Sequence, residues 1–286
     1  MIATLFYARM LRPRYSLQTL LVGVFALCVA LFAVGVQLRW HATQQKVLAA
    51  LDRFGPSVVF SHGNVVALSL KRTDITDDFM PQIGKLKYLE QLDLDWTNVS
   101  DTGVRHLTGL SRLRFLSLAG TQISNQALLT IGRLHHLEDL LIGSNKIGDA
   151  GMHHLRELSR LRCLDVGNTL IGDVGLGELT ALHQITRLYL RQSNVTDAGL
   201  DHLHHFPKLR FLALNHTLVT DGGVAKLQHF SHLESLWLHH TQITDSGLAA
   251  LHDLPNLQQL EVMETGVTSA GVAALERRLP QVRVLY

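Results

Sequence analysis

The sequence contains few of the residues that brace small secreted domains. Only two of its 286 residues are cysteine and six are proline, while aromatic residues make up 6% of the chain. Cys28 lies inside a long apolar run and Cys163 lies far from it, so no disulfide is expected to hold the C-terminal part together.

Motifs that carry chemistry are also missing. The chain has no Gly-x-x-x-x-Gly-Lys-Ser/Thr loop for phosphates, no His-Glu-x-x-His helix and no Gly-x-Ser-x-Gly elbow. The glycines Gly175 and Gly177 lack the third glycine of a dinucleotide-binding loop. We therefore expect no enzyme, no cofactor and no catalytic residues.

What the sequence does contain is a pattern that recurs every 24 residues without an insertion. The pattern reads Leu-x-x-Leu-x-Leu-x-x-Thr-x-Ile, followed by Thr-Asp-x-Gly-Leu-x-x-Leu-x-x-Leu. Its central leucine column comprises Leu68, Leu92, Leu116, Leu140, Leu164, Leu188, Leu212, Leu236 and Leu260, and ends at Val284. A fixed period of this length indicates a stack of identical structural units.

Each unit combines two periodicities. The first half alternates apolar and polar residues, which predicts a short strand. The second half places apolar residues at helical spacing, as in Leu200, Leu203 and Phe206, which predicts a helix of about two and a half turns. The recurring Asp is expected to cap its own helix, and the recurring Gly to permit close approach of neighbouring helices. Stacked units would bury one continuous core.

This pattern resembles the leucine-rich repeat family over residues 65–286. The resemblance implies an α/β fold: a curved horseshoe solenoid with parallel strands on the concave face and helices on the convex face. The family often has Asn or Cys where this chain has Thr, and a Thr hydroxyl can also bond the backbone of the turn. The Thr-Asp-x-Gly-Leu half is similar to the subtype of bacterial repeat proteins and F-box substrate receptors.

The N-terminal region has a different character. Residues 20–36 carry no polar side chain, a length that suits one transmembrane helix preceding the repeats. We predict a basic tail at 1–15, an anchor at 16–38, a juxtamembrane segment and N-terminal cap at 39–64, and a domain of nine 24-residue units plus a final strand at 65–286. The cap is expected to contain a short helix, a turn at Gly55-Pro56 and a strand.

The orientation of the anchor follows from flanking charges. Arg9, Arg12 and Arg14 precede the apolar run, whereas Arg39 and Lys46 follow it, which favours a cytoplasmic N-terminus and a periplasmic or extracellular repeat domain. A cleaved signal peptide is the alternative. The phrase RPRYSLQTLL before the run resembles the N-terminus of bacterial membrane-anchored leucine-rich repeat proteins.

The charge balance argues against nucleic acid as a partner. Five of the 26 Lys and Arg residues, and none of the 24 Asp and Glu residues, lie within residues 1–51. The rest of the chain therefore holds 21 basic and 24 acidic residues, too few cations for a surface that binds phosphates.

The residues that flank the leucine columns are expected to face outward on the concave side, where they vary. Trp, Tyr and Arg are the residue types that dominate protein-binding hot spots. A predicted partner-binding patch comprises Arg187, Tyr189, Arg191, Phe211, Asn215, Trp237 and His239. A second, acidic patch comprises Asp93, Asp95, Asp139 and Asp165. The alternative is that the aromatic residues only stabilise the sheet by cross-strand pairing.

Histidines offer one further candidate site. His216, His240 and Glu264 occupy one column, but strands lie about 4.8 Å apart, so the first and third would be about 10 Å apart. We therefore expect stacked polar turn residues and no metal.

Together these features predict a non-catalytic, membrane-anchored scaffold that binds a protein through its concave face. Two alternatives stay open: a substrate-recruiting adaptor on the cytoplasmic side, similar to F-box leucine-rich repeat receptors, and a binder of cell-wall glycan.

Overall fold

A computed structural model describes residues 17–286, which divide into two compact units between Lys46 and Val47. The predicted basic tail, residues 1–15, and the first residue of the predicted anchor lie outside the described residues. Helix α1 (Leu17–Leu51) covers the rest of the anchor and continues through the expected boundary after Leu38. It is long and apolar enough to cross a membrane, a test that a signal sequence also passes.

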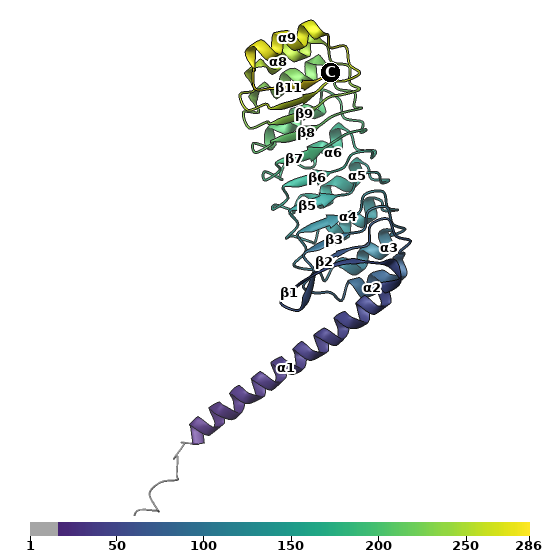
Figure 1. Cartoon of the computed structure of the whole chain (residues 1–286), viewed down its shortest axis with the longest axis vertical. Helices are drawn as coiled ribbons and strands as arrows, with labels where there is room; N and C mark the ends of the chain where they lie inside the picture. The colour runs from purple at the N-terminus through teal and green to yellow at the C-terminus, as the bar shows by residue number, and fades with distance from the viewer. Residues whose placement is uncertain (1–16) are drawn as a thin grey trace, which may run out of the picture. The chain divides into compact units, whose positions relative to one another are not determined.

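The second unit is built on an 11-stranded sheet whose strands follow one another in sequence order (Figure 1). Strand β1 (Ser57–Ser61) pairs antiparallel with β2, and every later pair is parallel. The remaining strands are β2 (Asn64–Ser69), β3 (Gln91–Asp93), β4 (Phe115–Ser117), β5 (Asp139–Leu141), β6 (Cys163–Asp165), β7 (Arg187–Tyr189), β8 (Phe211–Ala213), β9 (Ser235–Trp237), β10 (Gln259–Glu261) and β11 (Arg283–Leu285).

The 24-residue period sets the register of the sheet. Leu92 pairs with Leu68 on one side and with Leu116 on the other, and the same spacing holds up to Leu260 and Val284. Because the register is constant, each sequence column becomes a straight row across the strands. This confirms the predicted α/β repeat solenoid.

Short helices lie opposite the sheet. The α-helices are α2 (Met80–Ile83), α3 (Asp101–Val104), α4 (Asn125–Ile131), α5 (Asp149–Met152), α6 (Asp173–Gly177), α7 (Asp221–Val224), α8 (Asp245–Ala250) and α9 (Ser269–Arg278). The 3₁₀ helices are η2 (Asp52–Phe54), η3 (Asp77–Phe79), η4 (Arg105–Leu107), η5 (His153–Leu155), η6 (Gly199–His205), η7 (Ala225–His229) and η8 (Leu251–Asp253).

The predicted helix of two and a half turns is therefore wrong for most repeats. A typical unit instead has about one α-helical turn that tightens into a 3₁₀ turn, as in α3 followed by η4. A 3₁₀ helix advances about 2.0 Å per residue against 1.5 Å for an α-helix. A short segment can thus span the width of the coil within a 24-residue repeat.

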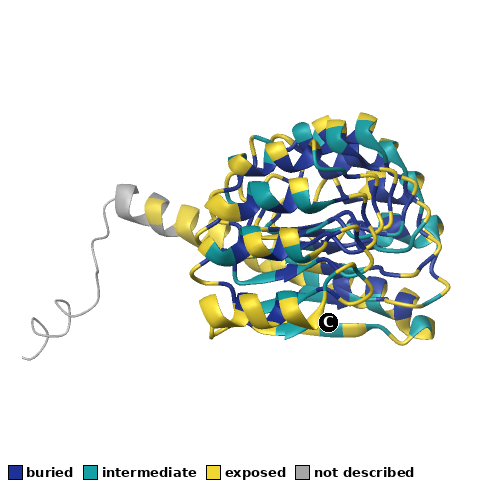
Figure 2. Ribbon diagram, turned by 90° about the horizontal axis from the view of Figure 1, so that it is seen from above, coloured by how far each residue is buried: buried dark blue, intermediate teal, exposed yellow. Residues whose placement is uncertain are grey.

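The core between sheet and helices is mainly aliphatic and continuous, as the recurring leucine columns predict. The leucine columns are almost entirely buried, and the largest fully buried side chain is Phe206. Figure 2 shows the buried residues gathered inside the solenoid and the exposed ones on its surface. At the N-terminal end of this unit, Val47 and Leu51 from the last turn of α1 belong to the same core. The expected short cap helix is thus the end of α1.

The threonine column holds the turn after each strand. The Thr97 hydroxyl donates to the carbonyl of Leu94 at 2.7 Å, and Thr169 does the same to Val166 at 2.6 Å. Asn145 is the one asparagine in this column. Its Nδ2 donates to the carbonyl of Ile142 at 3.0 Å and also reaches the preceding repeat, where it donates to the carbonyl of Leu118 at 2.7 Å. Asn145 therefore ties two repeats together.

The recurring aspartates do not cap their own helices, which corrects the prediction. Where an α-helix begins at the Asp, the residue before it is the N-cap: the Ser100 hydroxyl before Asp101, for example, accepts from the backbone N–H of Thr102. The carboxylate instead bonds the next repeat. Asp173 Oδ1 accepts from the backbone N–H of Thr196 at 2.8 Å, and its Oδ2 accepts from the Thr196 hydroxyl at 2.6 Å. A ladder of these carboxylates links successive repeats.

The same ladder explains the recurring glycines. A Cβ on Gly199 would lie 2.3 Å from Asp173 Oδ1, and a Cβ on Gly175 would lie 2.3 Å from Asp149 Oδ1. The expected reason, close approach of neighbouring helices, is confirmed, because a Cβ on Gly175 would also lie 3.0 Å from the Cα of Asp149, the first residue of α5. The space is filled by the aspartate of the preceding repeat.

Candidate functional site on the concave face

Three aromatic side chains of the predicted patch lie in contact on consecutive strands. The ring of Phe211 on β8 is 4.6 Å from that of Tyr189 on β7 and 4.7 Å from that of Trp237 on β9, measured between centroids. Tyr189 and Trp237 are both register partners of Ala213, whose small side chain is fully buried. The three rings, called here the aromatic cluster, surround this alanine. All three are half-buried and keep part of their surface accessible.

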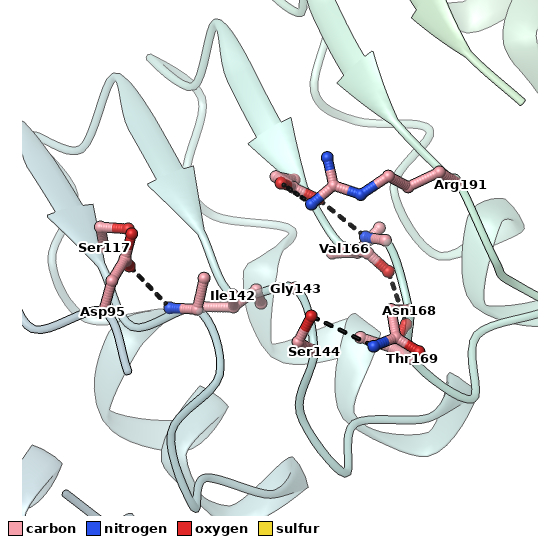
Figure 3. Close-up of polar contacts among 12 residues, drawn as sticks. Asp95, Ser117, Ile142, Gly143, Ser144, Val166, Asn168, Thr169 and Arg191 are labelled. Atoms are coloured by element: carbon pink, nitrogen blue, oxygen red, sulfur yellow. Dashed lines mark hydrogen bonds and ion pairs between the residues drawn. The ribbon is translucent and has the colours of Figure 1, made fainter. Parts of the chain in front are cut away.

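Two ion pairs join the two predicted patches. Arg187 on β7 donates to Asp139 Oδ1 on β5 at 2.7 Å, and Arg191 donates to Asp165 Oδ2 at 3.2 Å. The guanidinium of Arg191 is drawn in Figure 3. The arginines and the acids therefore form one continuous surface of alternating charge.

A glycine makes the second pair possible. A Cβ at Gly167 would lie 2.5 Å from Cγ of Arg191, so the arginine side chain lies directly across this residue. The Asp165 carboxylate below also accepts from the backbone N–H of Gly167 at 2.8 Å. Burial raises the pKa of Asp165 above its ordinary value, and the charge of Arg191 opposes this effect.

Asp95 is largely buried and is satisfied by its own chain. Its carboxylate accepts from Lys71 Nζ at 3.1 Å, from the backbone N–H of Ala119 at 3.0 Å and from the Ser117 hydroxyl (Figure 3). Asp93, by contrast, is half-buried and accepts only from neutral donors, the Ser69 hydroxyl and the backbone N–H of Asp95. Lys71 was not predicted as a site residue, although it shares a column with Arg191.

A hollow of about 370 Å³ lies between the two patches. It is lined by Phe115, Asp139, Leu141, Cys163, Asp165, Arg187 and Tyr189. Its Cys163 thiol is buried, and burial raises its pKa to about 11. The thiol is therefore protonated at neutral pH and contributes an apolar surface. Phe115, Leu141 and Cys163 were missing from the predicted site because their residue types alone gave no indication of a hollow.

Four buried polar atoms on two neighbouring strands have no hydrogen-bond partner within the described residues. They are Asn215 Oδ1, Ser235 Oγ, Trp237 Nε1 and His239 Nδ1, and all belong to the concave side of β8, β9 and the turns after them. Leaving such groups unpaired costs about 1–3 kcal/mol each, so native proteins contain few of them. Here they surround the C-terminal part of the predicted patch, and Ser235 is the member that the prediction missed.

The histidines form a stack at the edge of this patch. The rings of His216 and His240 lie parallel, 4.1 Å apart, and His240 Nδ1 is 3.1 Å from Glu264 Oε2. Burial lowers the pKa of His239, whereas nearby Glu261 opposes that shift. Among residues 17–286, no group of three or more His, Cys, Asp or Glu side chains is arranged to hold a metal ion.

His216 and His240 belong to a row of left-handed residues that the sequence did not reveal. One residue per repeat has a positive φ angle: Arg72, Trp96, Gly120, Ser144, Asn168, Gln192, His216, His240 and Glu264. The row includes only one glycine, so the usual residue signature of this conformation is absent.

Comparison with known proteins gives the following matches. The family model described as "Leucine-rich repeat region" matches residues 67–265. No curated protein matches the chain. Among solved structures, internalin C2 from Listeria monocytogenes str. 4b F2365 has 21% identity and a TM-score of 0.46, over 77% of this chain and 80% of its own. The plant peptide hormone receptor RGFR1, solved in complex with RGF2, has 15% identity and a TM-score of 0.47, over 71% of this chain and 36% of its own.

Proposed function

Because the chain belongs to the leucine-rich repeat family, we propose that it is a non-catalytic scaffold that binds a protein through its concave face. The sheet of the solenoid presents a broad surface, and the residues that differ from repeat to repeat are those that face outward on it. The proposed contact residues are those of the predicted patch, with Arg187, Tyr189, Phe211 and Trp237 providing accessible surface. Asn215 Oδ1 has no hydrogen bond among the described residues, and His239 Nδ1 has only a long contact of 3.5 Å with Glu261 Oε2.

The observation that carries this proposal is the coincidence of two features on β8 and β9. The aromatic cluster provides the residue types that dominate protein-binding hot spots. At the same place, four buried polar atoms have no hydrogen bond among the described residues. Cross-strand pairing of aromatics explains the first feature but not the second, and this difference favours recognition over sheet stability alone.

We further propose that α1 anchors the protein in a membrane and that the repeats lie outside the cytoplasm. The apolar helix and the arginines before it support this arrangement. Reporter fusions after Leu38 and after Tyr286 are expected to be active only outside the cytoplasm, with the native chain retained in the membrane fraction. A cytoplasmic C-terminal reporter would instead favour the adaptor hypothesis, and release of a shortened soluble chain would identify a cleaved signal.

Site-specific cross-linking tests the binding face. A photo-reactive amino acid at Ser235, in the full chain in its native membrane, is expected to give one discrete adduct with a protein. Trp237→Ala should reduce the yield of that adduct about tenfold, because truncating a hot-spot residue typically costs 2 kcal/mol or more. The matched control is the same cross-linker at Arg160, which is exposed in the turn before β6 and does not belong to the aromatic cluster.

The outcome of this experiment is decisive for the choice of partner. Equal adducts from Ser235 and Arg160, or an adduct that Trp237→Ala leaves unchanged, would refute recognition through the aromatic cluster. An adduct that glycosidase treatment removes would identify glycan as the partner instead.

A further inference from the structure

The concave face holds a second hollow, close to its N-terminal end. Its volume is about 240 Å³, and it lies over strands β1 to β4. Its lining includes Ser57, Val59, Ser69, Gln91, Asp93 and Phe115. Pockets for drug-sized molecules are commonly about 300–1,000 Å³, so this hollow suits a single side chain better than a whole small molecule.

Asp93 is the one charged residue that lines this hollow. It is also the one member of the acidic patch that has no ion pair among the described residues. Asp95 pairs with Lys71, Asp139 pairs with Arg187, and Asp165 pairs with Arg191. The chain therefore neutralises three of the four carboxylates itself.

Asp165 provides an internal template for the missing partner of Asp93. In both residues Oδ1 accepts from the backbone N–H two residues later, Gly167 or Asp95. At Asp165 the other oxygen accepts from the guanidinium of Arg191, but at Asp93 it accepts only from the Ser69 hydroxyl. The position that corresponds to Arg191, 26 residues after the aspartate, is Ala119 in this repeat. The acceptor geometry is thus retained while the cation is absent.

We propose that the hollow around Asp93 is the subsite for an arginine side chain of the protein partner. This inference rests on the function proposed above. The guanidinium pairs with the Asp93 carboxylate as Arg191 pairs with Asp165, and the alkyl stem lies against Val59.

The other lining residues favour arginine over lysine. Phe115 offers an aromatic ring on which a planar guanidinium can stack, and an ammonium lacks that planar face. The hydroxyl of Ser57 and the side-chain carbonyl of Gln91 add acceptors for the remaining N–H groups of an arginine, which carries five donors. Lysine has three donors and would leave more of these acceptors unused.

The test is a titration of the full chain in detergent micelles with Nα-acetyl-arginine amide, followed by NMR of backbone amides. Saturable shifts confined to Ser69, Gln91 and their neighbours are expected, with a dissociation constant on the order of millimolar for so small a ligand. Nα-acetyl-citrulline amide is the matched probe, because it has the same shape without the charge. It is expected to bind at least about tenfold more weakly.

Two variants separate the subsite from general effects of charge. Asp93→Asn should weaken binding of the arginine probe about tenfold or more, whereas Asp78→Asn, an exposed change on the helical side, should leave it unchanged.

Equal binding of the citrulline probe, or undiminished binding to Asp93→Asn, would overturn the arginine subsite. The cross-link from Ser235 reports on the proposed function independently. If that cross-link forms while the arginine probe fails, only the subsite is refuted. If the probe binds normally and no concave cross-link forms, the proposed protein-binding function fails instead.

Discussion

Replacing Asn145 with alanine is expected to lower the free energy of unfolding by about 3 kcal/mol, because it removes a buried hydrogen-bond hub. Asn145 Nδ2 contacts the carbonyls of Leu118, Ile142 and Gly143 at 2.7, 3.0 and 3.1 Å, and its Oδ1 accepts from the Thr121 hydroxyl at 3.1 Å. Alanine leaves the Leu118 carbonyl, which belongs to the preceding repeat, without this donor.

Urea unfolding of the full chain in detergent micelles, followed by far-ultraviolet circular dichroism, measures the loss. Asn145→Thr is the informative comparison, because Thr at this column bonds its own turn in the other repeats but is too short to reach the preceding one. Its cost should be smaller, about 1–2 kcal/mol. Gln122→Ala, an exposed change in the neighbouring repeat, should stay within about 0.5 kcal/mol. If Asn145→Ala unfolds at the midpoint of Gln122→Ala, the bridge between repeats contributes nothing.

Asn145 also illustrates which parts of the fold can be predicted from the sequence. The insertion-free period places Leu140 opposite Leu116 and Leu164, and this single fact fixes the order and register of nearly the whole sheet. A sequence column says which residues form a row. It does not say whether a polar side chain bonds within its own repeat or to a neighbour. Thr97 and Asn145 occupy the same column and differ in this respect.

The candidate site likewise has features that the sequence predicts and features that it does not. Alternation along each strand was enough to predict that Tyr189, Phe211 and Trp237 face outward on adjacent strands. Pairing between the patches was not predicted, because Arg187 and Asp139 are 48 residues apart and two strands apart. A long arginine side chain can cross an intervening strand, and periodicity carries no information about how far it extends. The positive φ angle of Arg72 or Gln192 was likewise hidden, since neither residue type favours that conformation.

These ion pairs bear on how the concave face recognises a partner. Arg187 and Arg191 hold their guanidinium groups in fixed positions before binding, so less side-chain freedom is lost when a partner docks. Their charges are already matched by Asp139 and Asp165, and they therefore offer little net attraction. In the acidic patch, Asp93 alone keeps a negative charge that the chain does not neutralise with an ion pair of its own. We expect the shape of the aromatic cluster to supply most of the affinity and Asp93 to select for a basic residue.

The carboxylate ladder is the second feature whose removal should be costly. Asp173→Ala is expected to lower the free energy of unfolding by about 2–3 kcal/mol, because it deletes two hydrogen bonds to a charged acceptor and leaves the backbone N–H of Thr196 unpaired. Asp173→Asn is the matched control. Asn125 occupies the same column and accepts from the backbone N–H of Gly148 at 2.9 Å, so an amide oxygen can replace the carboxylate toward the main chain. Its cost should be about 1 kcal/mol or less.

Low pH is expected to weaken the hydrogen bonds of the carboxylate ladder, and the pKa of Asp245 indicates why. Hydrogen bonds from the Thr268 hydroxyl, and then from its backbone N–H, lower the pKa of Asp245 below its ordinary value. A carboxylate whose pKa is lower in the folded state stabilises the fold above the unfolded pKa, and this contribution is lost as the pH falls through the folded pKa. The difference in unfolding free energy between the native chain and Asp245→Ala should therefore shrink as the pH falls from 5 towards 3. A difference that stays constant over that range would mean that Asp245 acts through packing against Gly271 and not through its charge.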